Sequence, residues 1–243
     1  MNKQFLSLMK CGQIFMSNRN SRPFSVLTYI TKEFNPSACR VEYLPDNIRK
    51  TKNGMHFAII IRNVLKKEEC DKWINDTEQK GYSIAGVNLG GGKQSYETDV
   101  RKGSRFLTDD TGISEQLWER ISPLIPKGIL GNKYSLPTGL NERLRFLRYD
   151  AGDFFALHND GAFTYPEDHP KAGLKSYVTF QLYLNDGFEG GATRMYSDDR
   201  SEFHDVVPEV GSVLLFQHEM FHSGEPVRQG RKYTVRTDMM FID

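Results

Sequence analysis

The stretch that decides the fold is ERLRFLRYDAGDFFALHND, residues 142–160. Apolar and polar residues alternate over much of 142–149, and a second short run, 154–158, follows the turn-forming segment Asp-Ala-Gly-Asp. Alternation with period two is typical of a β-strand that buries one face. The stretch therefore predicts two consecutive strands, and it marks the point from which this pattern prevails.

Further segments extend the pattern on both sides. Phe57–Arg62 is a β-branched run that predicts a strand, and 66–80 and 114–122 have apolar residues at helical spacing. Many short strands after two helices favour an α+β, mainly β fold: a double-stranded β-helix (jelly-roll) core with supporting N-terminal helices. The strands predicted from residue 142 onward are 142–149, 154–158, 176–184, 192–196, 204–206, 211–217 and 232–241.

The N-terminal part differs from the rest. Residues 1–54 are polar and dotted with proline, so we expect an N-terminal extension followed by one domain over 55–243. Residues 1–32 contain basic but no acidic side chains, a composition found both in mitochondrial targeting leaders and in disordered segments. The expected location is intracellular, with the cytoplasm favoured and the mitochondrion as the alternative.

The overall composition narrows the function classes. Net charge is +1 and hydrophobic content 38%, so neither nucleic acid nor a membrane is an expected partner, and no particular oligomer is indicated. The three cysteines, Cys11, Cys39 and Cys70, are scattered and form no zinc or disulfide pattern. Ile84–Tyr96, rich in glycine, is expected to be a loop, and the segments 82–105 and 161–175 are candidate lids.

Two candidate metal ligands end the opening stretch. His158 and Asp160 stand two positions apart at a predicted strand end, so their side chains point to the same side. A second histidine from a distant strand would complete a two-histidine, one-carboxylate triad, which leaves one face of octahedral Fe(II) open. His218 and His222 compete for that place. We favour His222 because it lies ten positions before Lys232, a cation that could hold an acidic co-substrate.

Five ordered motifs then suggest a family. They are Tyr149-x-x-Gly152, His158-x-Asp160, Tyr183-Leu-Asn, Glu189-Gly-Gly-Ala-Thr193 and His222-x-Gly-x-Pro-Val-x-x-Gly-x-Lys232. From about Phe57 to Asp243 the chain resembles the prolyl 4-hydroxylase-type 2-oxoglutarate/Fe(II) dioxygenases.

The resemblance implies a cofactor set and roles. His158, Asp160 and His222 would bind Fe(II), Lys232 would bind the far carboxylate of the co-substrate 2-oxoglutarate, and ascorbate is a candidate reductant. Tyr183 would hydrogen-bond the same carboxylate, and Tyr149 would line the pocket. Arg236 lies on the same strand face as Lys232, either sharing that carboxylate or forming a structural ion pair.

The resemblance leaves the substrate open. It implies hydroxylation of an unactivated C–H bond with succinate and CO2 as co-products, with a prolyl or other protein side chain favoured. A small molecule on the same scaffold is the alternative, and a non-catalytic cupin-like binding module is a third hypothesis. Arg143, Arg145 and Arg148 cannot all face one side of their strand. Surface ion pairing is favoured for them, with one at the substrate mouth as the alternative.

Overall fold

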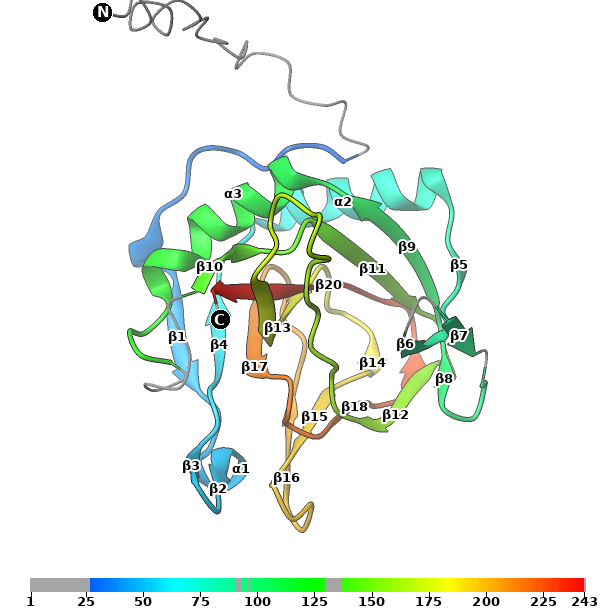
Figure 1. The fold of residues 1–243 in the computed structure, drawn as a ribbon. Coiled ribbons are helices and arrows are strands. Elements are labelled where there is room, and N and C mark those ends of the chain that lie inside the picture. Colours follow the sequence, from blue (N-terminus) through cyan, green and yellow to red (C-terminus); the bar gives the residue numbers. More distant parts are fainter. Residues whose placement is uncertain (1–26, 91–92, 96, 130–136, 243) are drawn as a thin grey trace, which may run out of the picture.

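The computed structural model describes residues 27–90, 93–95, 97–129 and 137–242. Two antiparallel sheets form the jelly-roll core that the sequence predicts, and two helices cover the outer face of the larger one (Figure 1). The helices are α2 (Lys67–Lys80) and α3 (Thr111–Ile121).

The larger sheet has the order β1-β4-β17-β13-β20-β11-β9-β5, with β10 beside β20. Its strands are β1 (Arg40–Tyr43), β4 (Ala58–Arg62), β5 (Ser83–Ile84), β9 (Ser104–Asp109), β10 (Pro137–Leu140), β11 (Arg143–Tyr149), β13 (Leu174–Tyr183), β17 (Val213–Gln217) and β20 (Lys232–Ile242).

The smaller sheet has the order β16-β15-β18-β12-β8. Its strands are β8 (Arg101–Lys102), β12 (Phe154–His158), β15 (Thr193–Tyr196), β16 (Phe203–Val206) and β18 (His222–Gly224). The remaining elements are η1 (Pro36–Ala38), α1 (Asp46–Arg49), β2 (Lys50–Thr51), β3 (Gly54–Met55), β6 (Val87–Gly90), β7 (Lys93–Ser95), η2 (Ser122–Leu124), β14 (Glu189–Gly190) and β19 (Val227–Gln229).

The two faces of the larger sheet differ in chemistry. On β20, Tyr233 and Val235 join Trp73 of α2 and Leu117 of α3 in the main apolar core. The alternate residues of the same strand turn towards the smaller sheet, where Lys232, Thr234 and Arg236 line a pocket. Because side chains alternate along a strand, one strand builds the core with one face and the site with the other.

The segment assigned to the N-terminal extension contributes to this fold where the structure describes it. Strand β1 pairs with β4 at the edge of the larger sheet, and Leu27 and Ile30 are buried in the main core. Residues 27–54 therefore pack onto the domain. Residues 1–26, with most of the basic leader, lie outside the described residues.

The structure changes some of the predicted elements. Helix α3 begins at Thr111, three residues early, because the Asp110 carboxylate accepts a hydrogen bond from the Ile113 amide and caps it. The segment expected to be a loop contains the hairpin β6–β7. Strands β1, β9 and β10 were not predicted.

The helices and the cysteines of the described chain bear on two properties, a membrane span and reactive thiols. None of its helices has the length and the apolar composition needed to cross a bilayer. Cys39 and Cys70 are free thiols, and burial raises the pKa of Cys70 to about 12. Cys70 is therefore a protonated core residue at neutral pH. Cys11 lies outside the described residues.

A buried ion pair joins the two helices to the N-terminal segment. Arg120 of α3 forms a two-pronged pair with Glu69 of α2, at 2.7 and 2.8 Å, and also donates to the carbonyls of Val64 and Thr31. Burial alone would raise the pKa of Glu69, but hydrogen bonds from Arg120 and two backbone amides lower it to about 2. The stability that this pair contributes is thus present above pH 4.5 and is lost as pH falls towards 2.

Replacing Arg120 with Ala should lower the free energy of unfolding by about 3–5 kcal/mol, because it leaves the Glu69 carboxylate buried and unpaired. Urea unfolding at neutral pH measures this loss. The matched control is Arg143→Ala, which breaks an exposed pair with Asp109 and should cost at most about 1 kcal/mol. If the two variants lost the same free energy of unfolding, the buried pair would contribute no more stability than the exposed one.

Candidate metal centre and pocket

The three predicted metal ligands lie close together at the ends of two paired strands of the smaller sheet. His158 ends β12 and His222 begins β18, and the two residues are register partners. Their side chains and that of Asp160 place one ligand atom each within 4.8 Å of one another. The Nε2 atom of each histidine is 3.8 Å from a carboxylate oxygen of Asp160.

Backbone carbonyls set the tautomer of both histidines. The Nδ1 atom of His158 lies 2.8 Å from the Ala156 oxygen, and that of His222 lies 3.0 Å from the Met220 oxygen. A carbonyl can only accept, so Nδ1 carries the hydrogen in each ring and Nε2 presents a lone pair. Both lone-pair nitrogens face the Asp160 carboxylate.

The protonation states suit a divalent metal. Burial, with the neighbouring His222, lowers the pKa of His158 to about 3, and burial also lowers the pKa of His222. For Asp160, burial alone would raise the pKa, but Arg236, the two histidines and the hydrogen bond from Thr179 together hold the pKa well below its usual range. Two neutral imidazoles and one ionised carboxylate are therefore present at neutral pH, as metal binding requires.

His218, the competitor for the third place, lies elsewhere. It is buried, and its Nε2 is 3.6 Å from an oxygen of Asp238. It is not part of the group of three. Its backbone carbonyl accepts from the amide of Asp160, so it supports the site through the main chain.

Arg236 and Thr179 position the Asp160 carboxylate. Arg236 Nη2 lies 2.8 Å from Oδ1, and the Thr179 hydroxyl donates to Oδ2. Arg236 and Lys232 lie on the same face of β20. The sequence left two roles open for Arg236, binding the co-substrate carboxylate or forming a structural ion pair, and in this structure it forms the ion pair with Asp160. On the other side of the triad, the Phe155 ring stacks on His158 with centroids 3.7 Å apart.

Lys232, the first residue of β20, is a buried cation. Its Nζ donates to the carbonyl of Gly191 at 2.6 Å and lies 5.7 and 5.6 Å from the ring centroids of Tyr149 and Tyr183. Among the described residues, no carboxylate forms an ion pair with it. Burial lowers the pKa of Lys232 to about 7. An uncompensated buried ammonium of this kind suits an anionic ligand group.

The two predicted tyrosines occupy different places. Tyr149 lines the pocket, whereas Tyr183 is fully buried and its hydroxyl donates to Thr193 Oγ1 at 2.8 Å. Gln181 donates to the same oxygen at 2.8 Å. Thr193 therefore keeps its own hydrogen for another acceptor. Gln181 and Thr193 were not predicted to be pocket residues. Thr193 ends one of the five motifs, and Gln181 lies two residues before the motif that begins at Tyr183.

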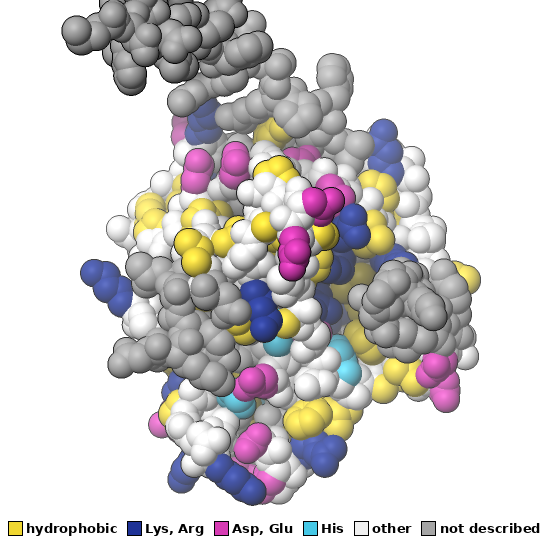
Figure 2. Space-filling view, viewed as in Figure 1, with side chains coloured by type: hydrophobic (Ala, Val, Ile, Leu, Met, Phe, Trp, Pro, Cys, Tyr) yellow, Lys and Arg dark blue, Asp and Glu magenta, His cyan; other side chains and the backbone are white. Residues whose placement is uncertain are grey.

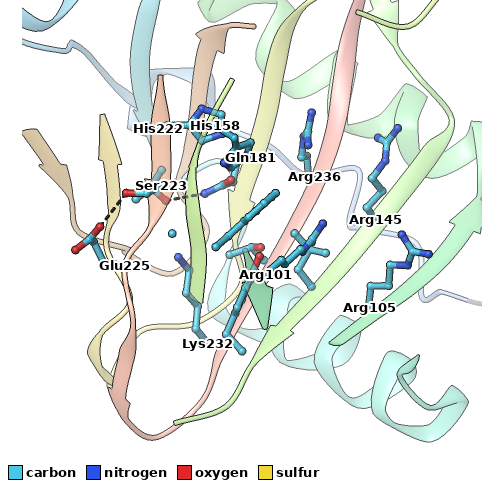
Figure 3. A pocket seen from close by; sticks show the side chains of 16 residues that line it. Arg101, Arg105, Arg145, His158, Gln181, His222, Ser223, Glu225, Lys232 and Arg236 are labelled. Atoms are coloured by element: carbon cyan, nitrogen blue, oxygen red, sulfur yellow. Dashed lines mark hydrogen bonds between the residues drawn. The ribbon is translucent and has the colours of Figure 1, made fainter. Parts of the chain in front are cut away.

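The pocket is lined by side chains from both sheets, and Figure 3 shows several of them, among them His158, His222, Gln181, Lys232 and Arg236. Asp160, Thr179, Tyr183 and His218 are not part of its lining. Of the candidate lids, 82–105 contributes Arg101 and Arg105 to its lining, whereas the described lining includes nothing from 161–175. Of the three clustered arginines, Arg145 lines the pocket, and Arg143 and Arg148 form ion pairs with Asp109 and Glu78.

The donor set fits ferrous iron. Two imidazole nitrogens and one carboxylate on one side of a metal, with open positions opposite, are typical of non-haem Fe(II) oxygenases. A buried lysine in the same pocket supplies a site for the far end of a dicarboxylic co-substrate.

Comparison with known proteins agrees with this chemistry. Residues 144–237 match the family model described as the 2OG-Fe(II) oxygenase superfamily. Among curated proteins, none matches the sequence.

Solved structures share the fold. A prolyl-4-hydroxylase from Pseudomonas putida is 18% identical, with TM-score 0.53, over 76% of this chain and 92% of that one. A prolyl hydroxylase from Trichoplax adhaerens, solved with a hypoxia inducible factor peptide fragment, is 21% identical, with TM-score 0.57, over 76% and 84%. A viral collagen prolyl hydroxylase from Paramecium Bursaria Chlorella virus-1 is 19% identical, with TM-score 0.50, over 76% and 97%.

The matched residues, 144–237, include His158, Asp160, His222 and Lys232. Residues 144–237 are therefore similar to the 2OG-Fe(II) oxygenase superfamily, and the jelly-roll fold is shared with the solved prolyl hydroxylases.

Proposed function

We propose that the chain hydroxylates an unactivated C–H bond of a protein side chain, with a prolyl residue as the favoured target. In the balanced reaction, 2-oxoglutarate, dioxygen and the substrate C–H group give succinate, CO2 and the C–OH product. The observation that carries the proposal is that His158 and His222 of the metal-binding triad line the same pocket as the buried Lys232.

Each part of the site has a defined task in this proposal. His158, Asp160 and His222 hold Fe(II), which supplies the redox chemistry that couples co-substrate decarboxylation to hydroxylation. Lys232 binds the 5-carboxylate of 2-oxoglutarate, with the Tyr149 ring beside it. Arg236 and Thr179 keep the Asp160 carboxylate ionised and fixed in direction. Ascorbate would serve as the external reductant.

A protein substrate is favoured over a small molecule by one observation on a similar fold. The Trichoplax adhaerens prolyl hydroxylase was solved with a peptide fragment bound. In this chain the site lies in a hollow on the surface, which Figure 2 shows on the face towards the viewer. A small-molecule substrate on the same scaffold is the second candidate. A non-catalytic binding module would not need the complete triad together with the buried lysine.

The first test needs no substrate. Under anaerobic conditions, Fe(II) and then 2-oxoglutarate should produce the visible charge-transfer band of the iron chelate, and the band should saturate with 2-oxoglutarate. His158→Ala and His222→Ala should abolish the band because each removes a metal ligand. His218→Ala is the control, and the band should persist in it since His218 lies outside the triad.

The outcome separates the hypotheses directly. A band that persists in His222→Ala but disappears in His218→Ala would reverse the ligand assignment. Folded, metal-loaded protein that gives no band would instead support the binding-module reading.

A second prediction follows from the charge state of Lys232. Its pKa is lowered from 10.5 to about 7 in the free protein, so the ammonium that binds the carboxylate is lost as pH rises above 7. With saturating Fe(II), the dissociation constant of 2-oxoglutarate should therefore increase by up to about tenfold per pH unit above that value. Anaerobic titrations between pH 6.5 and 8.5, followed by the chelate band, measure the dependence.

Lys232→Arg is the matched control, because a guanidinium stays charged throughout this range. Its affinity for 2-oxoglutarate should be weaker than that of the unmodified chain but nearly independent of pH. The same pH dependence in both proteins would exclude Lys232 as the titrating group.

A further inference from the structure

Asp238 is a buried carboxylate that has no task in the proposed function. It lies on β20 two residues after Arg236, so both side chains are on the face that turns towards the smaller sheet. It is also the register partner of Thr179 on β13, the residue whose hydroxyl donates to Asp160. Asp238 is therefore a neighbour of both side chains that hold the carboxylate of this metal ligand.

Three basic side chains surround the two oxygens of Asp238. Its Oδ2 lies 3.2 Å from Arg145 Nη1, and its Oδ1 lies 3.6 Å from His218 Nε2 and 3.7 Å from Arg236 Nη2. Burial alone would raise the pKa of Asp238, but these three neighbours lower it to about 2. Asp238 is therefore an ionised carboxylate at neutral pH.

Arg236 is shared between two buried carboxylates. Its Nη2 atom is 2.8 Å from Oδ1 of Asp160 and 3.7 Å from Oδ1 of Asp238. No other carboxylate of the described chain forms an ion pair with Arg236, and its buried Nε has no hydrogen-bond partner there. The position of the guanidinium therefore depends on the balance between these two acids, of which one is a metal ligand.

A second contact leads from Asp238 to the same ligand through the main chain. The His218 ring faces Asp238, and the His218 carbonyl accepts from the amide of Asp160 at 2.9 Å. His218→Ala would keep this carbonyl. The contact is therefore consistent with a chelate band that persists in His218→Ala, and it leaves Arg236 as the route from Asp238 to the Asp160 carboxylate.

The charges of this cluster balance one another. Arg145 and Arg236 are register partners on β11 and β20, and Figure 3 shows both beyond the two histidines. Asp160 and Asp238 supply the two opposite charges. Without the charge of Asp238, Arg236 would have Asp160 as its one carboxylate partner. It would then compete more strongly with a metal ion for the same carboxylate.

We infer that Asp238 is a positioning residue for the metal ligand Asp160 and that it acts through Arg236. By sharing the guanidinium, Asp238 limits how far Arg236 neutralises Asp160, and it fixes the side from which Arg236 approaches that carboxylate. The inference rests on the proposed function in that it takes the triad to bind Fe(II). Residues that hold a metal ligand from behind commonly change metal affinity by about 10–100-fold when they are replaced.

The experiment measures Fe(II) binding to the full chain by anaerobic equilibrium dialysis, without 2-oxoglutarate. Asp238→Asn keeps the size of the side chain but removes its charge, and it should weaken Fe(II) binding by at least about tenfold. The control is Asp153→Asn, which changes another buried carboxylate with a basic neighbour, Lys102 at 3.5 Å, outside the group of three ligands. The control should leave the Fe(II) affinity unchanged.

A double-variant cycle tests the route through Arg236. In the Arg236→Gln background, Asp238→Asn should change the Fe(II) affinity far less than in the unmodified chain, because the residue that transmits the effect is gone. A general structural defect at Asp238 would instead lower the affinity by the same factor in both backgrounds.

The chelate band gives a second readout that a purely structural role would not move. The band transfers charge from iron to 2-oxoglutarate, and a more strongly neutralised Asp160 donates less electron density to iron. The band of Asp238→Asn should therefore lie at shorter wavelength than that of the unmodified chain, whereas the band of Asp153→Asn should not move.

Unfolding curves show whether Asp238→Asn folds. If it does not, the double variant Arg145→Gln with Asp238→Asn restores the charge balance, while Arg236 still has Asp160 as its one carboxylate partner. This double variant should also bind Fe(II) at least about tenfold more weakly than the unmodified chain. Equal affinity would show that only net charge matters, and the positioning role would be wrong.

The remaining outcomes separate this inference from the proposed function. Unchanged Fe(II) affinity in Asp238→Asn, the same loss in Asp153→Asn, or equal losses in both backgrounds of the cycle would each overturn the inference. A chain that binds no Fe(II) would overturn the inference and the proposed function together. A chain that binds Fe(II) but gives no chelate band would contradict the proposed function alone, and dialysis would still decide the role of Asp238.

Discussion

One buried carboxylate, that of Asp160, holds the site in the arrangement on which everything else depends. It contacts the guanidinium of Arg236 and the hydroxyl of Thr179, and it faces the Nε2 atoms of both histidines. Its amide donates to the His218 carbonyl. A carboxylate in an apolar interior is costly unless each oxygen has partners, and here the partners come from both sheets. Because Asp160 needs partners from both sheets, its contacts favour one position of the two sheets relative to each other.

The strand that supplies these partners also supplies the core. Along β20, Tyr233, Val235, Met239 and Phe241 belong to the apolar cluster under the helices, whereas Lys232, Thr234 and Arg236 line the pocket. A shift of register by one residue would exchange the two sets and bury the cations against α2 and α3. The apolar face thus fixes the register, and the register places the cations.

Much of this arrangement is predictable from local pattern. The strands over 143–149 and 232–242 were predicted closely because alternation is a local signal that both faces of the sheet reinforce. His158 and Asp160 were found because they are two positions apart on one strand end, and His222 because of its distance from Lys232.

Other features depend on tertiary contacts and left little local signal. Strand β1 is a four-residue edge strand with no buried position, and β18 has only three residues, although it carries His222. The Arg101 and Arg105 side chains belong to short segments before the first predicted jelly-roll strand. Their proximity to the metal ligands follows from the pairing of β8 with β12 and of β9 with β11, which no spacing in the sequence encodes.

Two buried cations in this chain show how a structural charge differs from a functional one. Arg120 is surrounded by acceptors from within the protein: both oxygens of Glu69 and the carbonyls of Val64 and Thr31. Lys232 is equally buried but has one carbonyl, that of Gly191, and no carboxylate among the described residues. A cation whose partners are all internal stabilises the fold and leaves nothing for a ligand. A cation left short of partners destabilises the free protein, and it is retained where a ligand completes it. By this criterion Arg120 stabilises the fold, and Lys232 is suited to binding a ligand.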